Sequence, residues 1–248
     1  GADYSYTGSQ KLVGSSANYF TYTLNAGTGE GNYNITVHYG ELEVTNRTDK
    51  YTINVEANSG SKTYDGTALK VEGFKTLSFT VNGQTYTVSG LTASAEGTNV
   101  SDSKAVTVTG TAIVRDAANN DVTDQFAVTT KNGKLTINPV AIELTAASGS
   151  KPYDGTALTN NGYTITSGEF VGEEGLASVT VEGSQTLVGF SNNVITGHKL
   201  KEGTLSENYT ITYVNGELKV TDRTEKYAIE VEANSGSKTY DGTALKVE

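Results

Sequence analysis

Apolar and polar side chains alternate along several short stretches of this chain. In residues 51–56 (YTINVE) the tyrosine, isoleucine and valine occupy every second position, and the same alternation recurs in residues 140–144 and 227–231. Because successive side chains of a strand point to opposite faces, each stretch predicts a half-buried β-strand. No stretch sustains the spacing of an amphipathic helix, so the sequence predicts no helix.

Asn-Gly and Asp-Gly pairs between these stretches predict turns. Asn-Gly accepts the left-handed backbone of a type I′ turn, which joins two antiparallel strands. The sequence therefore predicts a hairpin at each Asn-Gly pair and a turn at each Asp-Gly pair. The Asn-Gly pairs begin at Asn82, Asn132, Asn161 and Asn215, and the Asp-Gly pairs begin at Asp65, Asp154 and Asp241.

The same succession of motifs occurs several times. Residues 55–72 (VEANSGSKTYDGTALKVE) recur letter for letter at residues 231–248, and residues 149–158 (GSKPYDGTAL) form a weaker copy between them. The Tyr-Asp-Gly triplets therefore recur with a structural period of about 88 residues. Such a period identifies a tandem array of supersecondary units. The triplets begin at Tyr64, Tyr153 and Tyr240.

Two further motifs recur along the chain, outside the Tyr-Asp-Gly elements. Residues 8–14 (GSQKLVG) match residues 183–189 (GSQTLVG). A second motif carries an alternating stretch and, in two of its copies, an Asn-Gly pair, so we interpret it as three versions of one hairpin. Its copies are residues 32–45, 125–138 and 208–221.

These repeats predict two complete β units and two partial ones. The complete units are residues 49–138 and 139–224; residues 1–48 match the C-terminal half of a unit, and residues 225–248 the N-terminal part of the next. We interpret the chain as a window on a longer array, in which residues 225–248 alone are too short to fold. The linkers are short and not rich in Gly or Ser, which predicts an elongated rod of fairly fixed units.

The predicted fold class is all-β. Within this class we prefer a small Ig-like β-sandwich for each repeat unit. A β-grasp-like unit is the alternative, although the sequence lacks an obvious helix for it.

Composition removes several classes of function. The 248 residues contain no Cys, Met or Trp and only two His, His38 and His198, and the formal net charge is -10. Disulfides and thiolate chemistry are therefore excluded, and a His-rich zinc site has too few ligands. The acidic balance argues against binding to nucleic acid, and no apolar stretch approaches the ~20 residues of a membrane-spanning helix. We expect no enzyme, no nucleic-acid partner and no membrane insertion in this region.

Three groups of side chains are candidates for a binding or catalytic site. The aspartates of the Tyr-Asp-Gly triplets, Asp65, Asp154 and Asp241, could be metal ligands or bases, but a turn explains them with fewer assumptions. Residues 116–124 (DAANNDVTD) offer oxygen ligands that could hold calcium. Tyrosines crowd the first 51 residues and could bind sugars, but strand packing is the preferred explanation.

We assign no catalytic, cofactor-binding or metal-binding residue, and no cofactor other than the calcium that stays open. His38 aligns with a valine of the other copy, and Glu173 and Glu174 are expected in a solvated loop. No nucleophile elbow, phosphate loop or zinc-protease motif occurs. A Lys–Asn or Lys–Asp isopeptide bond remains open without any residue assigned to it.

The order S-K-x-Y-D-G-T-A-L, G-S-Q-x-L-V-G and N-G-x-L resembles the tandem YDG/MBG-type repeats of large bacterial, probably Gram-positive, surface adhesins. The resemblance implies an extracellular, cell-wall-anchored protein whose repeats contact one another and form a stalk for a distal binding domain. Two alternatives stay open: the repeats themselves bind host glycans or matrix proteins, or chains assemble by adding residues 227–248 as strands to residues 1–48 of a neighbour.

Overall fold

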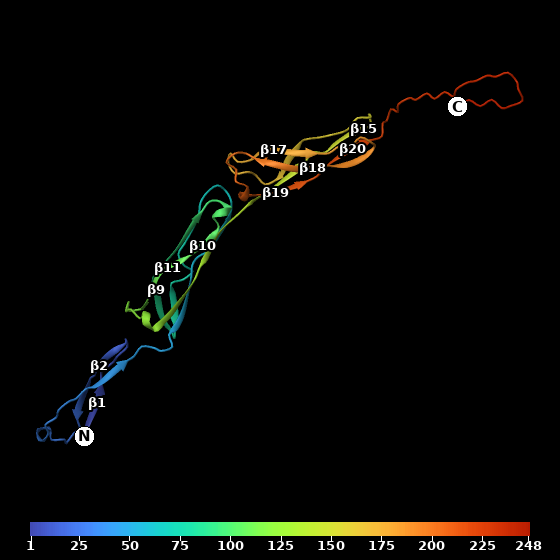
Figure 1. The fold of residues 1–248 in the computed structure, drawn as a ribbon. Helices are drawn as coiled ribbons and strands as arrows, with labels where there is room; N and C mark the ends of the chain where they lie inside the picture. The colour runs from blue at the N-terminus through green and yellow to red at the C-terminus, as the bar shows by residue number, and fades with distance from the viewer. The chain divides into compact units, whose positions relative to one another are not determined.

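The structure is a computed structural model that describes residues 1–248, and nearly all its regular elements are β-strands (Figure 1). The all-β prediction is confirmed. Helical geometry is limited to four single turns of 3-10 helix: η1 (Glu30–Asn32), η2 (Val100–Asp102), η3 (Thr123–Gln125) and η4 (Ser206–Asn208). None of the helical segments has the length and apolarity needed to cross a membrane.

Backbone contacts divide the chain into two compact parts, Gly1–Pro139 and Val140–Glu248. The first part opens with two small antiparallel sheets. One pairs β1 (Ala2–Tyr6) with β3 (Phe20–Leu24), and the other pairs β2 (Gly14–Asn18) with β4 (Gly40–Val44).

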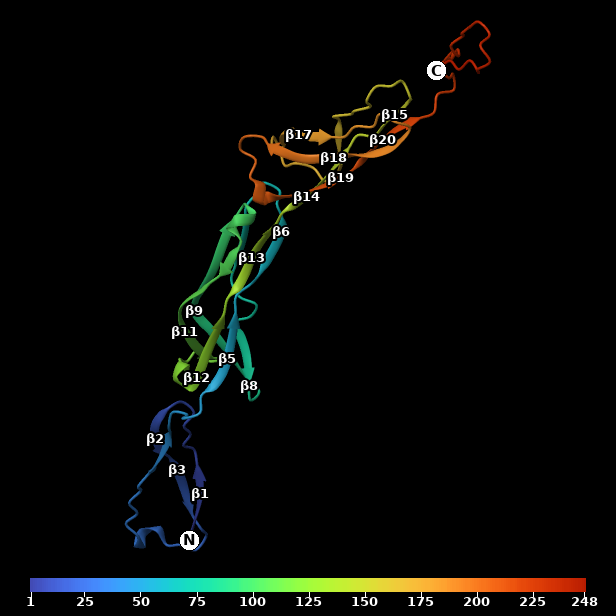
Figure 2. The same cartoon turned by 45° about the vertical axis from the view of Figure 1, so that its right-hand side comes forward.

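Residues 49–138 are closed by parallel pairing of their first and last strands. β5 (Tyr51–Glu56) runs parallel to β12 (Phe126–Lys131), and β6 (Gly60–Thr63) runs parallel to β13 (Gly133–Asn138), as Figure 2 shows. The other edge of β13 takes the short antiparallel strand β10 (Lys104–Val106). The long strand β9 (Gln84–Gly97) pairs antiparallel with three others. They are β7 (Leu69–Glu72), β8 (Ser78–Val81) and β11 (Val108–Asp116).

The second part uses the same parallel pairing. β14 (Val140–Ala146) runs parallel to β19 (Tyr209–Val214), and β15 (Gly149–Pro152) runs parallel to β20 (Gly216–Thr221). These pairs correspond to β5 with β12 and β6 with β13. The remaining strands pair antiparallel: β16 (Tyr163–Ser167) with β14, β18 (Gly189–Leu200) with β20, and β17 (Leu176–Glu182) with β18.

The alternating residues of the paired strands form the core, as the sequence pattern predicts. In β5, Ile53 and Val55 are buried while Thr52 and Asn54 are exposed. The buried side chains Ile53, Val55, Val88, Val114 and Phe126 form one cluster. Removal of such side chains from water is the main favourable term in folding, about 25 cal/mol per Å² of apolar surface. The second part buries Ile142, Leu144, Leu218 and Val220 in the corresponding strands.

Only one of the four predicted Asn-Gly hairpins is present. Asn82 and Gly83 have φ of +49° and +75° and connect the antiparallel strands β8 and β9. The predictions of hairpins at Asn132, Asn161 and Asn215 are wrong. Neither these residues nor the glycines that follow them have a positive φ. β12 and β13 do not pair with each other, nor do β19 and β20, because each pairs with an N-terminal strand of its own repeat.

The glycines in two of these pairs have a different role. A Cβ atom at Gly133 would lie 1.9 Å from the backbone oxygen of Asn58, and one at Gly216 would lie 2.5 Å from the backbone oxygen of Ala147. Glycine is needed there because two backbones approach closely, and not because the chain turns. The single-hairpin interpretation of residues 32–45, 125–138 and 208–221 is therefore wrong.

The strand predicted at residues 227–231 is also absent. Residues 227–248 contain no strand, and Ile229 and Val231 are 82% and 91% exposed. Residues 55–72 have the same sequence as residues 231–248 and contain β6, β7 and the end of β5. The difference arises because β5 and β6 need β12 and β13 as partners.

Candidate functional site

The Tyr-Asp-Gly element is a turn that closes on a lysine three positions before the aspartate. The Lys62 ammonium donates to Asp65 Oδ1 at 2.5 Å and to Thr67 Oγ1 at 2.7 Å, and the Thr67 amide donates to Asp65 Oδ1 at 2.9 Å. Gly66 has φ of +77°, a left-handed conformation that glycine adopts at little cost. The aspartate and glycine therefore have the structural role that the sequence analysis favoured.

The other two copies build the same turn. The Lys151 ammonium lies 2.9 Å from Asp154 Oδ1 and 2.7 Å from Thr156 Oγ1. In the third copy the Lys238 ammonium lies 2.8 Å from Asp241 Oδ1, although no strand surrounds it. The turn is therefore specified locally by its own residues.

These contacts stabilise the charged form of each aspartate. The Lys62 ammonium, with the hydroxyl and amide of Thr67, lowers the pKa of Asp65 from 3.8 to about 2. The pKa values of Asp154 and Asp241 lie below their usual range for the same reason. A carboxylate held charged by several donors is a weak proton acceptor at neutral pH, so these aspartates are suited to structure rather than to general-base catalysis.

The lowered pKa of Asp65 predicts that residues 49–138 lose stability in acid. A carboxylate with a lowered pKa contributes stability that is complete above pH 3.8 and is lost as the pH falls towards 2. We expect Asp65→Asn to flatten the pH dependence of unfolding of residues 49–138 in this window. Hydrogen exchange of β5 and β6 at a series of pH values measures the effect. Asp241→Asn is the matched control, and an equal effect from it would contradict the prediction.

The acidic loop at residues 116–124 uses its oxygens to cap its own backbone. Asp116 Oδ1 accepts from the amides of Ala118 and Asn120, each at 2.9 Å. Asp121 Oδ1 accepts from the Thr123 amide at 3.0 Å and from its hydroxyl at 2.7 Å. No group of three or more His, Asp or Glu side chains is placed to hold a metal ion. Calcium binding stays a prediction of the sequence.

Several aromatic side chains of the first 51 residues pack against one another while remaining exposed. Tyr4 and Tyr6 are 60% and 68% exposed, and both rings contact Phe20 with centroids 5.8 Å and 5.9 Å apart. Tyr19 and Tyr39 form another edge contact at 4.9 Å. Each such aromatic pair contributes about 0.5–1.5 kcal/mol to stability in addition to the burial of its apolar surface. The full set is Tyr4, Tyr6, Tyr19, Phe20, Tyr22, Tyr33, Tyr39 and Tyr51.

The remaining sequence candidates are not brought together. His198 shares a hydrogen bond of 2.5 Å with the Tyr213 hydroxyl, whereas Glu174 accepts a hydrogen bond from Tyr209. His38 lies outside the strands in the first part of the chain. These groups therefore do not form one reacting centre.

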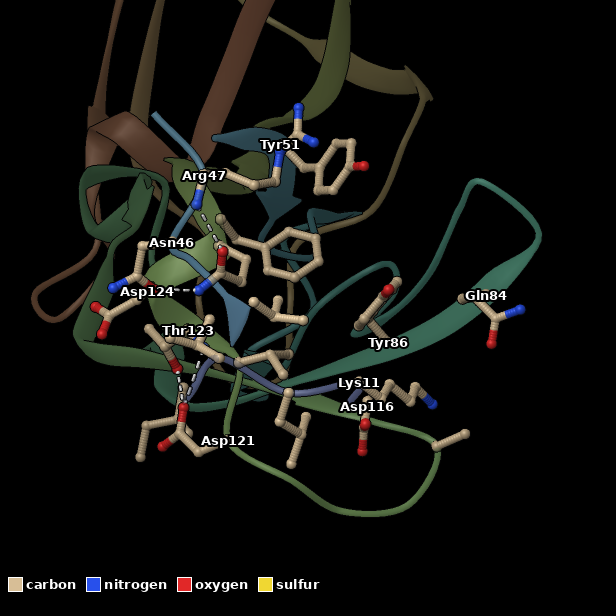
Figure 3. A pocket seen from close by; sticks show the side chains of 18 of the residues that line it. Lys11, Asn46, Arg47, Tyr51, Gln84, Tyr86, Asp116, Asp121, Thr123 and Asp124 are labelled. Carbon is tan, nitrogen blue, oxygen red and sulfur yellow. Dashed lines mark hydrogen bonds between the residues drawn. The ribbon is translucent and has the colours of Figure 1, made fainter. Parts of the chain in front are cut away.

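A cavity of about 760 Å³ lies where residues 11–13 and 44–47 meet residues 49–138 (Figure 3). Its wall combines apolar groups with charged and amide groups. The volume of this cavity is within the range of small-ligand sites, and its wall carries more polar and charged side chains than aromatic ones. The aromatic members are Tyr51, Tyr86 and Phe126, and the polar members include Lys11, Asn46, Arg47, Gln84, Asp116, Asp121, Asp124 and Gln125.

Arg47 organises one side of this cavity. Its guanidinium carbon lies 4.0 Å from the centre of the Tyr51 ring, and its Nε donates to the Asp49 carbonyl at 2.9 Å. Gln125 bridges to the same segment: its Oε1 accepts from the Arg47 amide at 3.0 Å, and its Nε2 donates to Asn46 Oδ1 at 2.6 Å. Residues 46–47 are thus tied to residues 49–138 through one amide side chain.

The same arginine arrangement recurs 176 residues further on. The Arg223 guanidinium carbon lies 4.1 Å from the centre of the Tyr227 ring, and Arg223 Nε donates to the Glu225 carbonyl at 2.8 Å. Here Nη1 also donates to the Tyr153 carbonyl at 3.1 Å. An open hollow of about 460 Å³ lies beside it, lined by Tyr153, Val188, Asp222, Arg223, Lys226 and Tyr227.

Sequence reasoning did not single out either arginine. The available signal was the linker itself, because T-N-R-T-D-K-Y at residues 45–51 matches T-D-R-T-E-K-Y at residues 221–227. An arginine four residues before a tyrosine can place its planar guanidinium on the ring, which is a favourable cation–π geometry. The repeated linker is therefore a small structural motif of its own.

No protein-family model matches this sequence, and neither the curated proteins nor the solved structures yield a similar chain.

Proposed function

We propose that this chain is a non-catalytic stalk region of a bacterial surface adhesin, with tandem YDG/MBG-type repeats that project a distal binding domain from the cell wall. The observation that carries the proposal is the shared strand pairing of residues 49–138 and 139–224. In each, the first two strands run parallel to the last two. A unit whose two ends are tied together this way can repeat in series without depending on distant units.

We further propose that each repeat is a small Ig-like sandwich, and that the repeats follow one another as an elongated rod. Alternating burial on the paired strands supports a sandwich, because each strand offers one apolar face. The β-grasp alternative has less support, since the only helical elements are single 3-10 turns. The locked Lys–Asp–Thr turns support a rigid spacer, because the turn forms from local residues in all three copies.

Lengthening the array tests the stalk. Insertion of one further 176-residue period should increase the maximum dimension measured by small-angle X-ray scattering in proportion to the number of repeats. The control is an insertion of equal length that is rich in Gly and Ser. It should increase the maximum dimension less, because the end-to-end distance of a flexible chain grows only with the square root of its length. A maximum dimension that does not grow with the added repeats would overturn the stalk.

The cavity beside Arg47 favours a second candidate function, binding of host glycans or matrix proteins by the repeats themselves. Aromatic rings beside carboxylates and amides suit a sugar, which presents both apolar faces and hydroxyl groups. A binding screen of the chain against mucin glycans and matrix proteins, with and without calcium, tests this candidate. Binding should saturate and be weakened by Tyr86→Ala but not by Tyr163→Ala, whose ring lies in the other part of the chain. Absence of binding would leave the adhesive role to another domain.

A further inference from the structure

Two motifs occur together in some repeats and are absent together from another. Residues 1–48 and residues 139–224 both contain the Leu-Val-Gly loop and both are followed by the arginine linker. Residues 49–138 have neither: the corresponding loop carries η2 (Val100–Asp102), and the linker is Asn138–Pro139. The loop and the arginine therefore belong to one kind of repeat.

Three motifs meet at the end of residues 139–224 where the chain leaves. Tyr153 of the Tyr-Asp-Gly turn, Val188 of the Leu-Val-Gly loop and Arg223 of the linker all line one open hollow. The hydrogen bond from Arg223 Nη1 to the Tyr153 carbonyl ties two of them directly. These motifs therefore meet on one surface, which we name the end face: Tyr153, Leu187, Val188 and Arg223.

The apolar loop of the end face is uncovered. Leu187 and Val188 are 70% and 50% exposed. In the first part of the chain their counterparts Leu12 and Val13 are 38% and 46% exposed, and they line the cavity together with Ile113 of residues 49–138. The leucine of this loop is therefore more covered where a repeat follows it.

We propose that the end face is a docking surface for a repeat of the 49–138 kind, in the manner in which residues 11–13 and 44–47 meet that repeat. The proposal rests on the proposed arrangement of repeats in series. Continuity with the first junction supports it, as does the sequence that follows the end face, because residues 231–248 are identical to residues 55–72.

Gln125 gives the docking its specificity. At the first junction its amide contacts both Asn46 and Arg47. Asp222 replaces Asn46 at the end face, so the same amide would donate to a carboxylate, which is a stronger hydrogen bond. In residues 139–224 the position of Gln125 is taken by Asn208, which is fully buried within its own repeat. A repeat of the 139–224 kind therefore presents no amide to this surface.

The two junctions differ in one charge. Thr186 replaces Lys11, so the second junction lacks the positive charge that faces Asp116 at the first junction.

An extended chain tests the proposal. Because residues 231–248 repeat residues 55–72, adding a copy of residues 73–138 after Glu248 completes a repeat of the 49–138 kind. The sequence contains no tryptophan, so Leu187→Trp introduces a single probe in the end face. We expect emission at shorter wavelength and several-fold weaker acrylamide quenching in the extended chain than in the 248-residue chain. Equal emission and quenching in the two chains would overturn the proposal.

Two controls separate docking from folding of the added residues. Gln125→Ala in the appended copy leaves its core intact and should return the quenching most of the way to that of the unextended chain. Leu12→Trp in the unextended chain tests the first junction, where the probe should already be protected and Gln125→Ala should expose it. Protection that is unaffected by both glutamine variants would contradict the specificity proposed for Gln125. Circular dichroism of the extension reports its folding, and scattering tests the stalk independently.

Discussion

Gly133→Ala is expected to destabilise residues 49–138 strongly. The added Cβ would lie 1.9 Å from the Asn58 carbonyl oxygen and 2.9 Å from that of Ala57, both of which are backbone atoms. Backbone cannot rotate away as a flexible side chain can, so β13 must separate from the end of β5. Overpacking of this kind costs about 3 kcal/mol, a large share of the roughly 5–15 kcal/mol that stabilises a domain.

Urea unfolding followed by circular dichroism, with hydrogen exchange of β5, β6 and β13, measures this loss. Gly197→Ala is the matched control, since Gly197 also lies in a strand but a Cβ there meets no atom within 4 Å. An unchanged unfolding midpoint for Gly133→Ala would show that the two backbones do not approach as closely as described. Gly216→Ala should repeat the effect in the second part, where two backbone oxygens lie 2.5 Å from the added atom.

Asn193→Val is expected to destabilise residues 139–224 by about 2 kcal/mol. Asn193 is fully buried, and its Nδ2 donates to the carbonyls of Ala147 at 2.8 Å and Asn160 at 2.6 Å. Valine would leave both carbonyls without this donor. It would also remove the buried Oδ1, which has no hydrogen-bond partner, and this offsets part of the loss.

The other repeat shows how the loss can be restored. Val106 pairs with Gly133 as Asn193 pairs with Gly216, so valine is accepted at this position in residues 49–138. There Asn58 supplies a nearby amide: its Nδ2 donates to the Glu72 carbonyl at 2.7 Å, and Glu72 corresponds to Asn161, the neighbour of Asn160. Asn58 corresponds to Ala147, so we expect Ala147→Asn to add a hydrogen bond to the Asn161 carbonyl and to recover part of the stability lost in Asn193→Val. A double variant no more stable than the single one would contradict this exchange of roles.

Much of the local structure followed from the residues themselves. The alternation in residues 51–56 and 140–144 correctly placed β5 and β14, because alternate side chains must face the core. The Lys–Asp–Thr turn forms in all three copies, with strands around it or without them. Asn82–Gly83 is a true hairpin turn, since β8 and β9 are neighbours in sequence and in space.

The candidate site was less predictable from sequence. The sequence placed the three aspartates in turns, but it did not reveal that a lysine closes each turn. It also gave no reason to expect Arg47 beside Gln125, which lies 78 residues away. Contacts of that separation depend on how β5 and β12 pair, and the alternation within each strand does not identify its partner.

Two segments with identical sequences show most clearly what the sequence by itself determined and what the tertiary structure decided. The sequence determined the all-β class and the local turns. It could not decide whether a given stretch becomes a strand: residues 55–72 contain strands, and the same letters at residues 231–248 contain none. Likewise, residues 209–214 form β19 beside β14, whereas the related residues 33–38 form no strand. An isolated strand leaves its backbone groups unpaired, so it forms only where a partner from the other end of the repeat supplies the hydrogen bonds.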